Sequence, residues 1–155
     1  MHEVPQPIAA FLLGRRFVVA GVSRAAKQPP NAIFRKLREV GFDVVPVNPH
    51  ASHLEGATCY PGLGAVPGEV DGLIVVTHPA AAESLVRQAA ARGIGQIWFH
   101  RSFGTGSVSE AALRACADLG IVPIVGGCPM MYCEPVDLAH RCFRWWLGHR
   151  EHIPA

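Results

Sequence analysis

The residues of this chain that could carry chemistry gather just after short apolar runs. Gly21-Val22-Ser23-Arg24 follows the first such run, and Lys27 comes shortly after it. Glycine lets the chain turn tightly and lets backbone N–H groups approach a phosphate, while Ser23, Arg24 and Lys27 would add donors. The helix expected behind this turn would present its positive end. The segment therefore predicts an anion-binding loop, and an ordinary turn with solvated basic residues is the alternative.

This first turn lacks the fingerprint of a dinucleotide-binding enzyme. That fingerprint requires G-x-G-x-x-G in the turn and an acidic residue at the end of the second strand. Ser23 stands where the second glycine would be, and the second run ends in Val47-Asn48-Pro49 without a carboxylate. An NAD-dependent oxidoreductase is therefore disfavoured. A serine-hydrolase elbow is disfavoured as well, because G-x-S-x-G would need glycine at Ala25.

Three further residues could act as acids, bases or nucleophiles. His78 and His100 follow the third and fourth runs and could converge at one edge of a sheet. Cys128 follows the last run and could be a reactive thiol. We favour the alternatives, which are histidines that line or cap loops and a buried, inert cysteine. The cysteines and histidines near the C-terminus lack the paired spacing of a structural zinc site, so no metal is expected.

The elements that must position these residues alternate in type along the chain. Most of the short runs are apolar at nearly every position, which is typical of strands buried on both faces. The alternation predicts an α/β fold, a three-layer doubly wound (Rossmann-like) parallel sheet of about five strands with helices on both faces. Strands are expected at residues 16–20, 43–47, 72–76, 96–99 and 120–125, and helices at about 7–13, 30–40, 79–92, 107–119 and 135–147.

Composition limits the class of protein. The 155 residues are 50% apolar and 17% charged with a net charge of +2, so we expect a single domain over residues 1–155 with its core at about 10–147. The charges form no basic stripe of the kind that a nucleic-acid-binding protein usually carries. No apolar run approaches the ~18 residues of a membrane span. Five cysteines without a signal peptide favour reduced thiols and a cytoplasmic protein. A homo-oligomer or a protein partner remains open.

A series of motifs, taken in order, is similar to a known family. The motifs are Gly21-Val22-Ser23 with Lys27, Pro46-Val47-Asn48-Pro49, Tyr60-Pro61-Gly62-Leu63, Val70-Asp71-Gly72 and Cys128-Pro129-Met130-Met131. Together they resemble the stand-alone CoA-binding domain family, which is itself similar to the N-terminal CoA-binding domain of the succinyl-CoA synthetase α subunit. The resemblance spans roughly residues 10–147.

The resemblance implies a set of ligand-binding residues. The first-turn segment, Gly21, Val22, Ser23 and Arg24, would cradle the phosphates of CoA, with Lys27 as a charge partner. The loop after the second strand would border the adenosine, and the loop after the third would close over the ligand. These two loops contribute Val47, Asn48 and Pro49, and Thr77, His78 and Pro79.

The function that the resemblance implies is non-covalent binding of CoA or an acyl-CoA. The synthetase carries its phosphorylated histidine in a second domain, for which this chain is too short, so we expect no complete catalytic site. The alternative is an enzyme that acts on a nucleotide-linked or thioester substrate through His78, His100 or Cys128.

Overall fold

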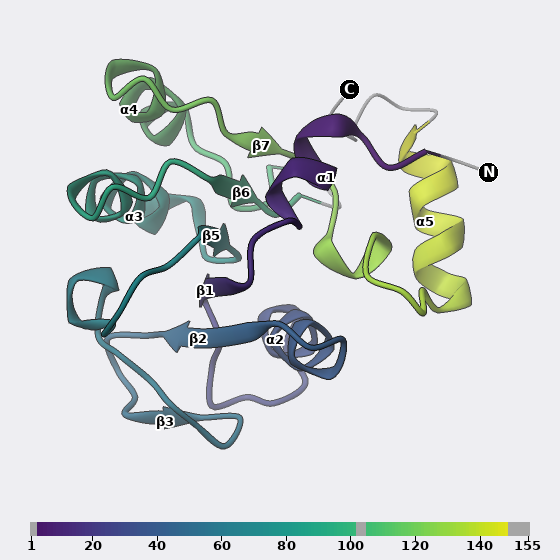
Figure 1. The fold of residues 1–155 in the computed structure, drawn as a ribbon, viewed down its shortest axis with the longest axis horizontal. Coiled ribbons are helices and arrows are strands. Elements are labelled where there is room, and N and C mark those ends of the chain that lie inside the picture. Colours follow the sequence, from purple (N-terminus) through teal and green to yellow (C-terminus); the bar gives the residue numbers. More distant parts are fainter. Residues whose placement is uncertain (1–2, 102–104, 149–155) are drawn as a thin grey trace.

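The fold is built on a parallel sheet, whose strands follow one another from β7 at the top to β2 at the bottom of Figure 1. The computed structural model describes residues 3–101 and 105–148. All neighbouring strands of the main sheet run parallel, and their order is β2-β1-β5-β6-β7. The predicted doubly wound sheet is confirmed. Its strands are β1 (Arg16–Ala20), β2 (Asp43–Val47), β5 (Gly72–Val75), β6 (Ile97–Phe99) and β7 (Ile124–Val125).

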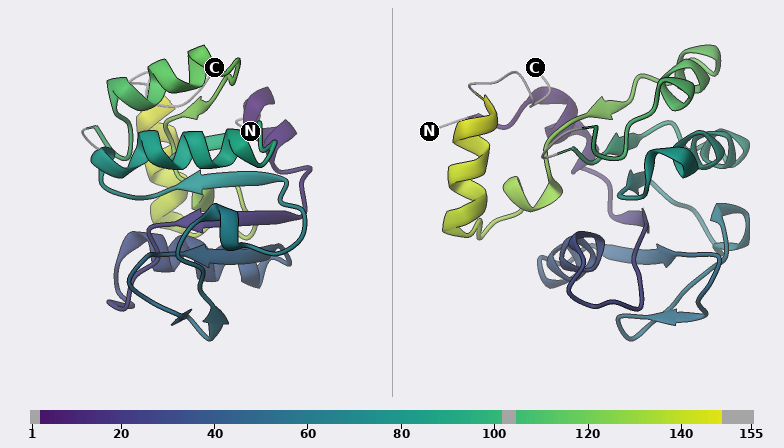
Figure 2. Two further views of the ribbon diagram at one scale, coloured as in Figure 1. Left: turned by 90° about the vertical axis from the view of Figure 1, so that its left-hand side faces the viewer. Right: turned by 180° about the vertical axis from the view of Figure 1, so that it is seen from behind.

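Helices cover both faces of this sheet. In Figures 1 and 2, α3 and α4 lie on one side of the strands, whereas α1, α2 and α5 lie on the other. The helices are α1 (Gln6–Phe11), α2 (Pro29–Glu39), α3 (Pro79–Ala91), α4 (Glu110–Asp118) and α5 (Leu138–Gly148), and two short 3₁₀ turns are η1 (Leu63–Ala65) and η2 (Pro129–Met131). Within the described part of the chain, no helix is long and apolar enough to cross a membrane.

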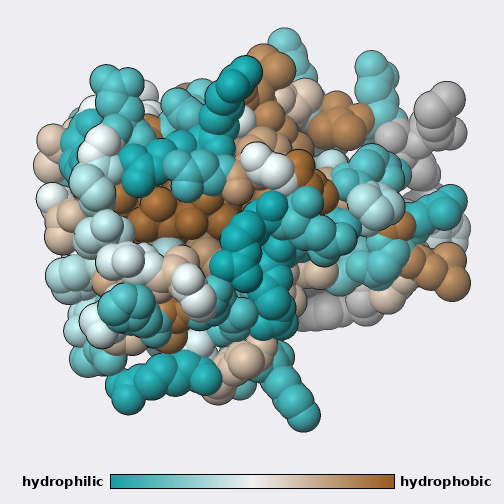
Figure 3. Space-filling view, turned by 60° about the horizontal axis from the view of Figure 1, so that its bottom comes forward, coloured by the Kyte–Doolittle hydropathy of each residue, from teal (hydrophilic) through white to brown (hydrophobic). Residues whose placement is uncertain are grey.

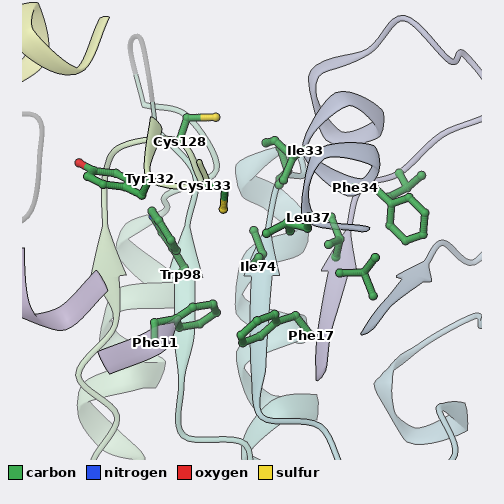
Figure 4. Close-up of a cluster of buried hydrophobic side chains, with 14 of the residues drawn as sticks. Phe11, Phe17, Ile33, Phe34, Leu37, Ile74, Trp98, Cys128, Tyr132 and Cys133 are labelled. Carbon is green, nitrogen blue, oxygen red and sulfur yellow. The ribbon is translucent and has the colours of Figure 1, made fainter. Parts of the chain in front are cut away.

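Strand side chains alternate between two apolar clusters, one on each face. Phe17 and Val19 of β1 pack with α1 and α2, whereas Val18 and Ala20 pack with α3 and α4. Figure 4 shows the first cluster, in which residues from α1, α2, β1, β5 and β6 meet. Because both faces are covered, each strand must be apolar throughout, which explains the continuous runs in the sequence.

Several element ends differ from the sequence-based expectation. The last strand is confined to Ile124–Val125 instead of residues 120–125, since Gly120 has a left-handed φ of +69° and Pro123 lacks an N–H. Helix α4 begins at Glu110 instead of residue 107, because the Ser109 hydroxyl accepts the Ala112 N–H at 3.1 Å and caps it. Helices α1 and α5 are likewise displaced by a few residues from the predicted 7–13 and 135–147.

A small hairpin was not predicted. Its strands β3 (His53–Leu54) and β4 (Ala57–Thr58) are two residues long and are joined by Glu55 and Gly56. Both turn residues have positive φ, +52° and +74°, as a tight hairpin turn requires. Such short strands carry no detectable periodicity, which is why the sequence did not reveal them.

The strand order places a crevice at the centre of the sheet. From β1 the chain passes to β2 on one side, and it later returns to β5 on the other side of β1. The two loops that leave β1 and β5 therefore separate, and the carboxyl ends of these strands border a topological switch point, where ligands of doubly wound sheets bind.

Candidate functional site

A cavity of about 360 Å³ lies at this switch point. Residues at the carboxyl ends of β1, β2 and β5 form one part of its wall, and α3 and the segment before η1 form the rest. On the face that Figure 3 presents, apolar side chains gather in a hollow that hydrophilic side chains surround. The residues that line the cavity are Ala20, Gly21, Val47, Asn48, Pro49, Pro61, Gly62, Thr77, Ala81, Ser84, Leu85 and Gln88.

Gly21 makes the turn out of β1 and the close approach to β5. Its φ is +114°, and a Cβ at this position would lie 2.1 Å from the Val76 carbonyl oxygen. Its N–H donates to the Val47 carbonyl oxygen at 3.4 Å, which ties the ends of β1 and β2 together. Only glycine fits this position, as the sequence predicted from the need for a tight turn.

Asn48, directly after β2, connects the β1–α2 loop with the segment before η1. Its amide nitrogen donates to the Val22 carbonyl oxygen at 2.9 Å, and its amide oxygen accepts the His50 N–H at 2.8 Å. Its own N–H donates to the Tyr60 carbonyl oxygen at 2.9 Å. Asn48 therefore holds three segments in place around the mouth of the cavity.

The α3 wall carries polar groups but no charge. Gln88 accepts the Leu63 N–H at 3.0 Å and donates to the Ser84 hydroxyl at 3.1 Å. The Thr77 hydroxyl donates to the His78 carbonyl oxygen at 3.2 Å. None of the twelve lining residues is ionisable. The cavity thus suits an uncharged, partly polar portion of a ligand rather than a phosphate.

A second pocket of about 320 Å³ lies between the β1–α2 loop and the β3–β4 hairpin. It is lined by Ser23, Arg24, Ala26, His53, Leu54 and Glu55. The exposed Arg24 guanidinium reaches across and donates to the His50 carbonyl oxygen at 2.9 Å. Because Arg24 is exposed and lines this pocket, a phosphate there would find a positive charge.

The start of α2 offers few free backbone N–H groups. Its first two residues, Pro29 and Pro30, have no N–H, and the N–H groups of Asn31 and Ala32 both donate to the Gln28 carbonyl oxygen. The prediction that this helix presents its positive end to an anion stays a prediction, since its first turn leaves few N–H groups free to donate. Anion recognition here would depend on the loop backbone and on side chains.

The eleven predicted ligand-binding residues fall into four groups. Gly21, Val47, Asn48, Pro49 and Thr77 line the cavity. Ser23 and Arg24 line the second pocket. Val22 is fully buried in the core, and exposed Lys27 and the α3-capping residues His78 and Pro79 line neither pocket.

The sequence-based prediction missed the cavity residues on α3 and, at one side of the cavity mouth, Pro61 and Gly62. Pro61 and Gly62 belong to a motif that carried the family resemblance, so a signal for them existed. Ser84 and Gln88 are four residues apart on α3 and look like ordinary solvent-facing helix residues. Only the docking of α3 beside β5 brings them to the switch point.

The structure shows the surroundings of His78 and Cys128, two residues of the enzymatic alternative. The His78 ring accepts the Ala80 N–H at 3.2 Å through Nδ1 and caps α3, as the capping alternative predicted. Burial raises the pKa of the Cys128 thiol to about 12, so at neutral pH it is protonated and a weak nucleophile. This agrees with the interpretation of Cys128 as a buried, inert cysteine.

His100 lies directly after β6 and is poorly solvated. Burial, assisted by the nearby His140, lowers the pKa of His100 to about 4. The unfolded chain would take up this proton near pH 6.5, whereas the folded chain would not do so until about pH 4. Stability contributed by neutral His100 is therefore complete above pH 6.5 and decreases as the pH falls from 6.5 to 4.

This titration predicts a measurable pH dependence. Between pH 7 and pH 5 we expect His100 to cost the folded protein up to about 2 kcal/mol of unfolding free energy. Urea denaturation at both pH values should show a smaller loss for His100→Gln than for the parent protein. The exposed His53→Gln serves as the control, and equal losses in all three proteins would contradict the assignment.

Other features of the surface do not form a second candidate site. A larger hollow of about 810 Å³ lies along α5 and the segment before it, away from the carboxyl ends of β1, β2 and β5. All five cysteines are free thiols. Among residues 3–101 and 105–148, no group of three or more histidine, cysteine or acidic side chains is arranged to hold a metal ion.

Comparison with known proteins gives a match over most of the chain. The family described as "CoA binding domain" matches residues 15–134, which include every strand and both pockets. A curated relative, the ADP-forming acetate–CoA ligase II of Archaeoglobus fulgidus, is 32% identical over 78 residues. That match covers 49% of this chain and 12% of the ligase, so the chain spans a small fraction of its relative.

Solved structures share the fold. A conserved hypothetical protein from Pyrococcus furiosus aligns with a TM-score of 0.63 and 28% identity, covering 70% of this chain and 90% of that one. A hypothetical protein from Pyrococcus horikoshii OT3 aligns with a TM-score of 0.76 and 23% identity, covering 88% of this chain and 99% of that one. The second likeness, at this identity, supports the fold alone.

Proposed function

Because the chain belongs to the CoA-binding domain family, we propose that it binds CoA or an acyl-CoA non-covalently at the switch-point cavity. The observation that carries this proposal is the position of the cavity, which lies between the ends of β1 and β5 and is enclosed by Gly21, Asn48 and Thr77. This is the edge at which doubly wound sheets bind nucleotides.

The two pockets suit the two kinds of surface that CoA presents. The uncharged cavity would take an uncharged part of the molecule, where Ser84 and Gln88 offer hydrogen-bonding groups. The phosphates would remain outside, on the side where Arg24 lines the second pocket and Lys27 is exposed. This division keeps the charged phosphates in contact with solvent and buries the uncharged part of the ligand.

No reaction is part of this proposal. Cys128 is protonated at neutral pH, and the His78 ring nitrogen Nδ1 is used to cap α3. The acetate–CoA ligase relative is much longer than the matched segment, and its ligase activity is not transferred to this chain. We propose a module that binds CoA and either retains it or presents it to another protein.

Calorimetric titration tests the contribution of the phosphates. We expect CoA to bind with a single site, dephospho-CoA to bind more weakly, and Arg24→Ala to reduce CoA affinity about tenfold through the loss of a charge-assisted contact. Arg114→Ala is the matched control, because Arg114 is an exposed arginine on α4 that lines neither pocket. A folded protein that gives no heat with CoA, or an Arg24→Ala variant equal to Arg114→Ala, would contradict the proposal.

A further inference from the structure

The side chain of Asn31 holds the β1–α2 loop by hydrogen bonds to the loop backbone. This residue lies in the first turn of α2, and only 1% of its surface is exposed. Its amide oxygen accepts the Ser23 N–H at 3.0 Å, and its amide nitrogen donates to the Ser23 carbonyl oxygen at 2.7 Å. One side chain therefore satisfies both backbone groups of Ser23, which an aliphatic residue or a carboxylate at position 31 could not do.

Glu55, in the turn of the β3–β4 hairpin, is the acceptor on which these contacts converge. One of its oxygens, Oε1, accepts from the Asn31 amide at 2.7 Å and from the Arg35 guanidinium at 2.8 Å. The hydrogen bond from Asn31, followed by the Arg35 contact, lowers the pKa of Glu55 against the effect of desolvation. Arg38 donates to the Glu55 carbonyl oxygen at 2.7 Å and fixes the turn itself.

The contacts of Glu55 reach both ends of one short segment. The Asn31 contact leads to Ser23, and Arg35 also donates to the Ala26 carbonyl oxygen at 3.0 Å. Glu55 thus holds two side chains, each of which holds one end of residues 23–26. The start of α2 cannot replace this support, because its first two residues are prolines without an N–H.

We propose that Glu55 is a positioning residue for ligand binding, which acts through Asn31 and Arg35 to fix residues 23–26 in the conformation that faces the ligand. The proposal rests on the function proposed above, because Ser23, Arg24 and Ala26 line the pocket assigned to the phosphates.

Amide hydrogen exchange of the ligand-free protein tests the positioning directly. In Glu55→Ala we expect the Ser23 N–H to exchange at least about tenfold faster, while the amides of β1 and β5 keep their protection. Glu83→Ala is the matched control, because Glu83 makes a 2.8 Å ion pair with Arg87 on the exposed side of α3. Unchanged Ser23 exchange, or equally faster exchange throughout the sheet, would overturn the proposal.

Affinity measurements separate positioning from a merely structural contribution. Because Glu55 itself lines the pocket assigned to the phosphates, both Glu55→Ala and Glu55→Gln also remove a negative charge that would repel the ligand. We expect the loss of positioning to outweigh this gain, so that CoA binds about tenfold more weakly to Glu55→Ala and about threefold more weakly to Glu55→Gln, which keeps an acceptor oxygen but loses the charge. Glu83→Ala should bind as the parent protein does. Equal affinity of Glu55→Ala and the parent would overturn the role of Glu55.

The same experiment distinguishes the failure of the two proposals. If the parent protein shows no affinity for CoA but Ser23 exchange accelerates in Glu55→Ala, the positioning of the loop stands and the assigned ligand is wrong. If the parent binds CoA and neither the exchange nor the affinity responds to Glu55→Ala, the ligand assignment stands and the positioning role is wrong. Where Glu55→Ala fails to fold, Glu55→Gln supplies both measurements.

Discussion

Replacing Gly21 with alanine is expected to destabilise the fold by at least about 3 kcal/mol and to abolish ligand binding at the switch point. The added Cβ would lie 2.1 Å from the Val76 carbonyl oxygen, so β1 and β5 would have to separate at their carboxyl ends. The left-handed φ of +114° adds a penalty of its own. Chemical denaturation and CoA titration measure the two effects.

Gly41→Ala is the matched control for this substitution. Gly41 also has a left-handed φ, +99°, but a Cβ there would meet nothing within 4 Å. It should therefore show only the conformational penalty, about 1–2 kcal/mol, and should bind CoA normally. If Gly21→Ala were no less stable than Gly41→Ala, the close approach of the Gly21 turn to β5 would be contradicted.

Trp98→Ala is expected to cost about 3–5 kcal/mol of unfolding free energy. Trp98 is fully buried at the centre of the cluster in Figure 4, with its ring centroid 5.6 Å from that of Phe11 and 5.9 Å from that of Tyr132. Its indole N–H donates to the Gly126 carbonyl oxygen at 2.8 Å, so truncation would leave both a cavity and an unsatisfied acceptor.

Two variants make this expectation specific. Trp98→Phe keeps most of the ring volume but loses the hydrogen bond, and we expect roughly half of the loss. Trp145→Ala removes the same side chain from the exposed side of α5, where 56% of its surface is accessible, and should cost less than about 1 kcal/mol. Denaturant midpoints compare them, and equal losses for Trp98→Ala and Trp145→Ala would refute the central role of Trp98.

The sheet could be predicted because its evidence is local in the sequence. Each strand of a sheet that is covered on both faces must be apolar at successive positions, as Phe17, Val18 and Val19 are. Helix ends depend on such local features too, since Ser109 caps the start of α4 and Gly93 adopts a left-handed φ just after α3. The order of the strands then determines where the switch point lies.

The site was only partly predictable because much of it is assembled by tertiary contacts. Gly21 and Asn48 directly follow strands, so their positions were evident. Gln88 lies in the middle of α3, and only packing brings it to the cavity. Val22 was assigned to the ligand from its place in a motif, yet alternation along the chain turns its side chain into the core.

The contacts of Glu55 could not be predicted from the sequence for a different reason. Its carboxylate is 20 residues from Arg35 and 24 from Asn31 along the chain, and the hairpin that carries it has no sequence signal. A charged residue before a glycine in a loop is normally read as solvated. Its side chain is only 12% exposed, and this became evident only with the fold.

The most direct test of the central claim is the mapping of backbone amide NMR shifts during titration with CoA. We expect the largest changes at residues that line the two pockets, among them Gly21, Gly62, Thr77 and Gln88, with those of α4 and α5 nearly unchanged. Changes centred on the α5 hollow, or no changes at millimolar CoA with the protein folded, would contradict binding at the switch point.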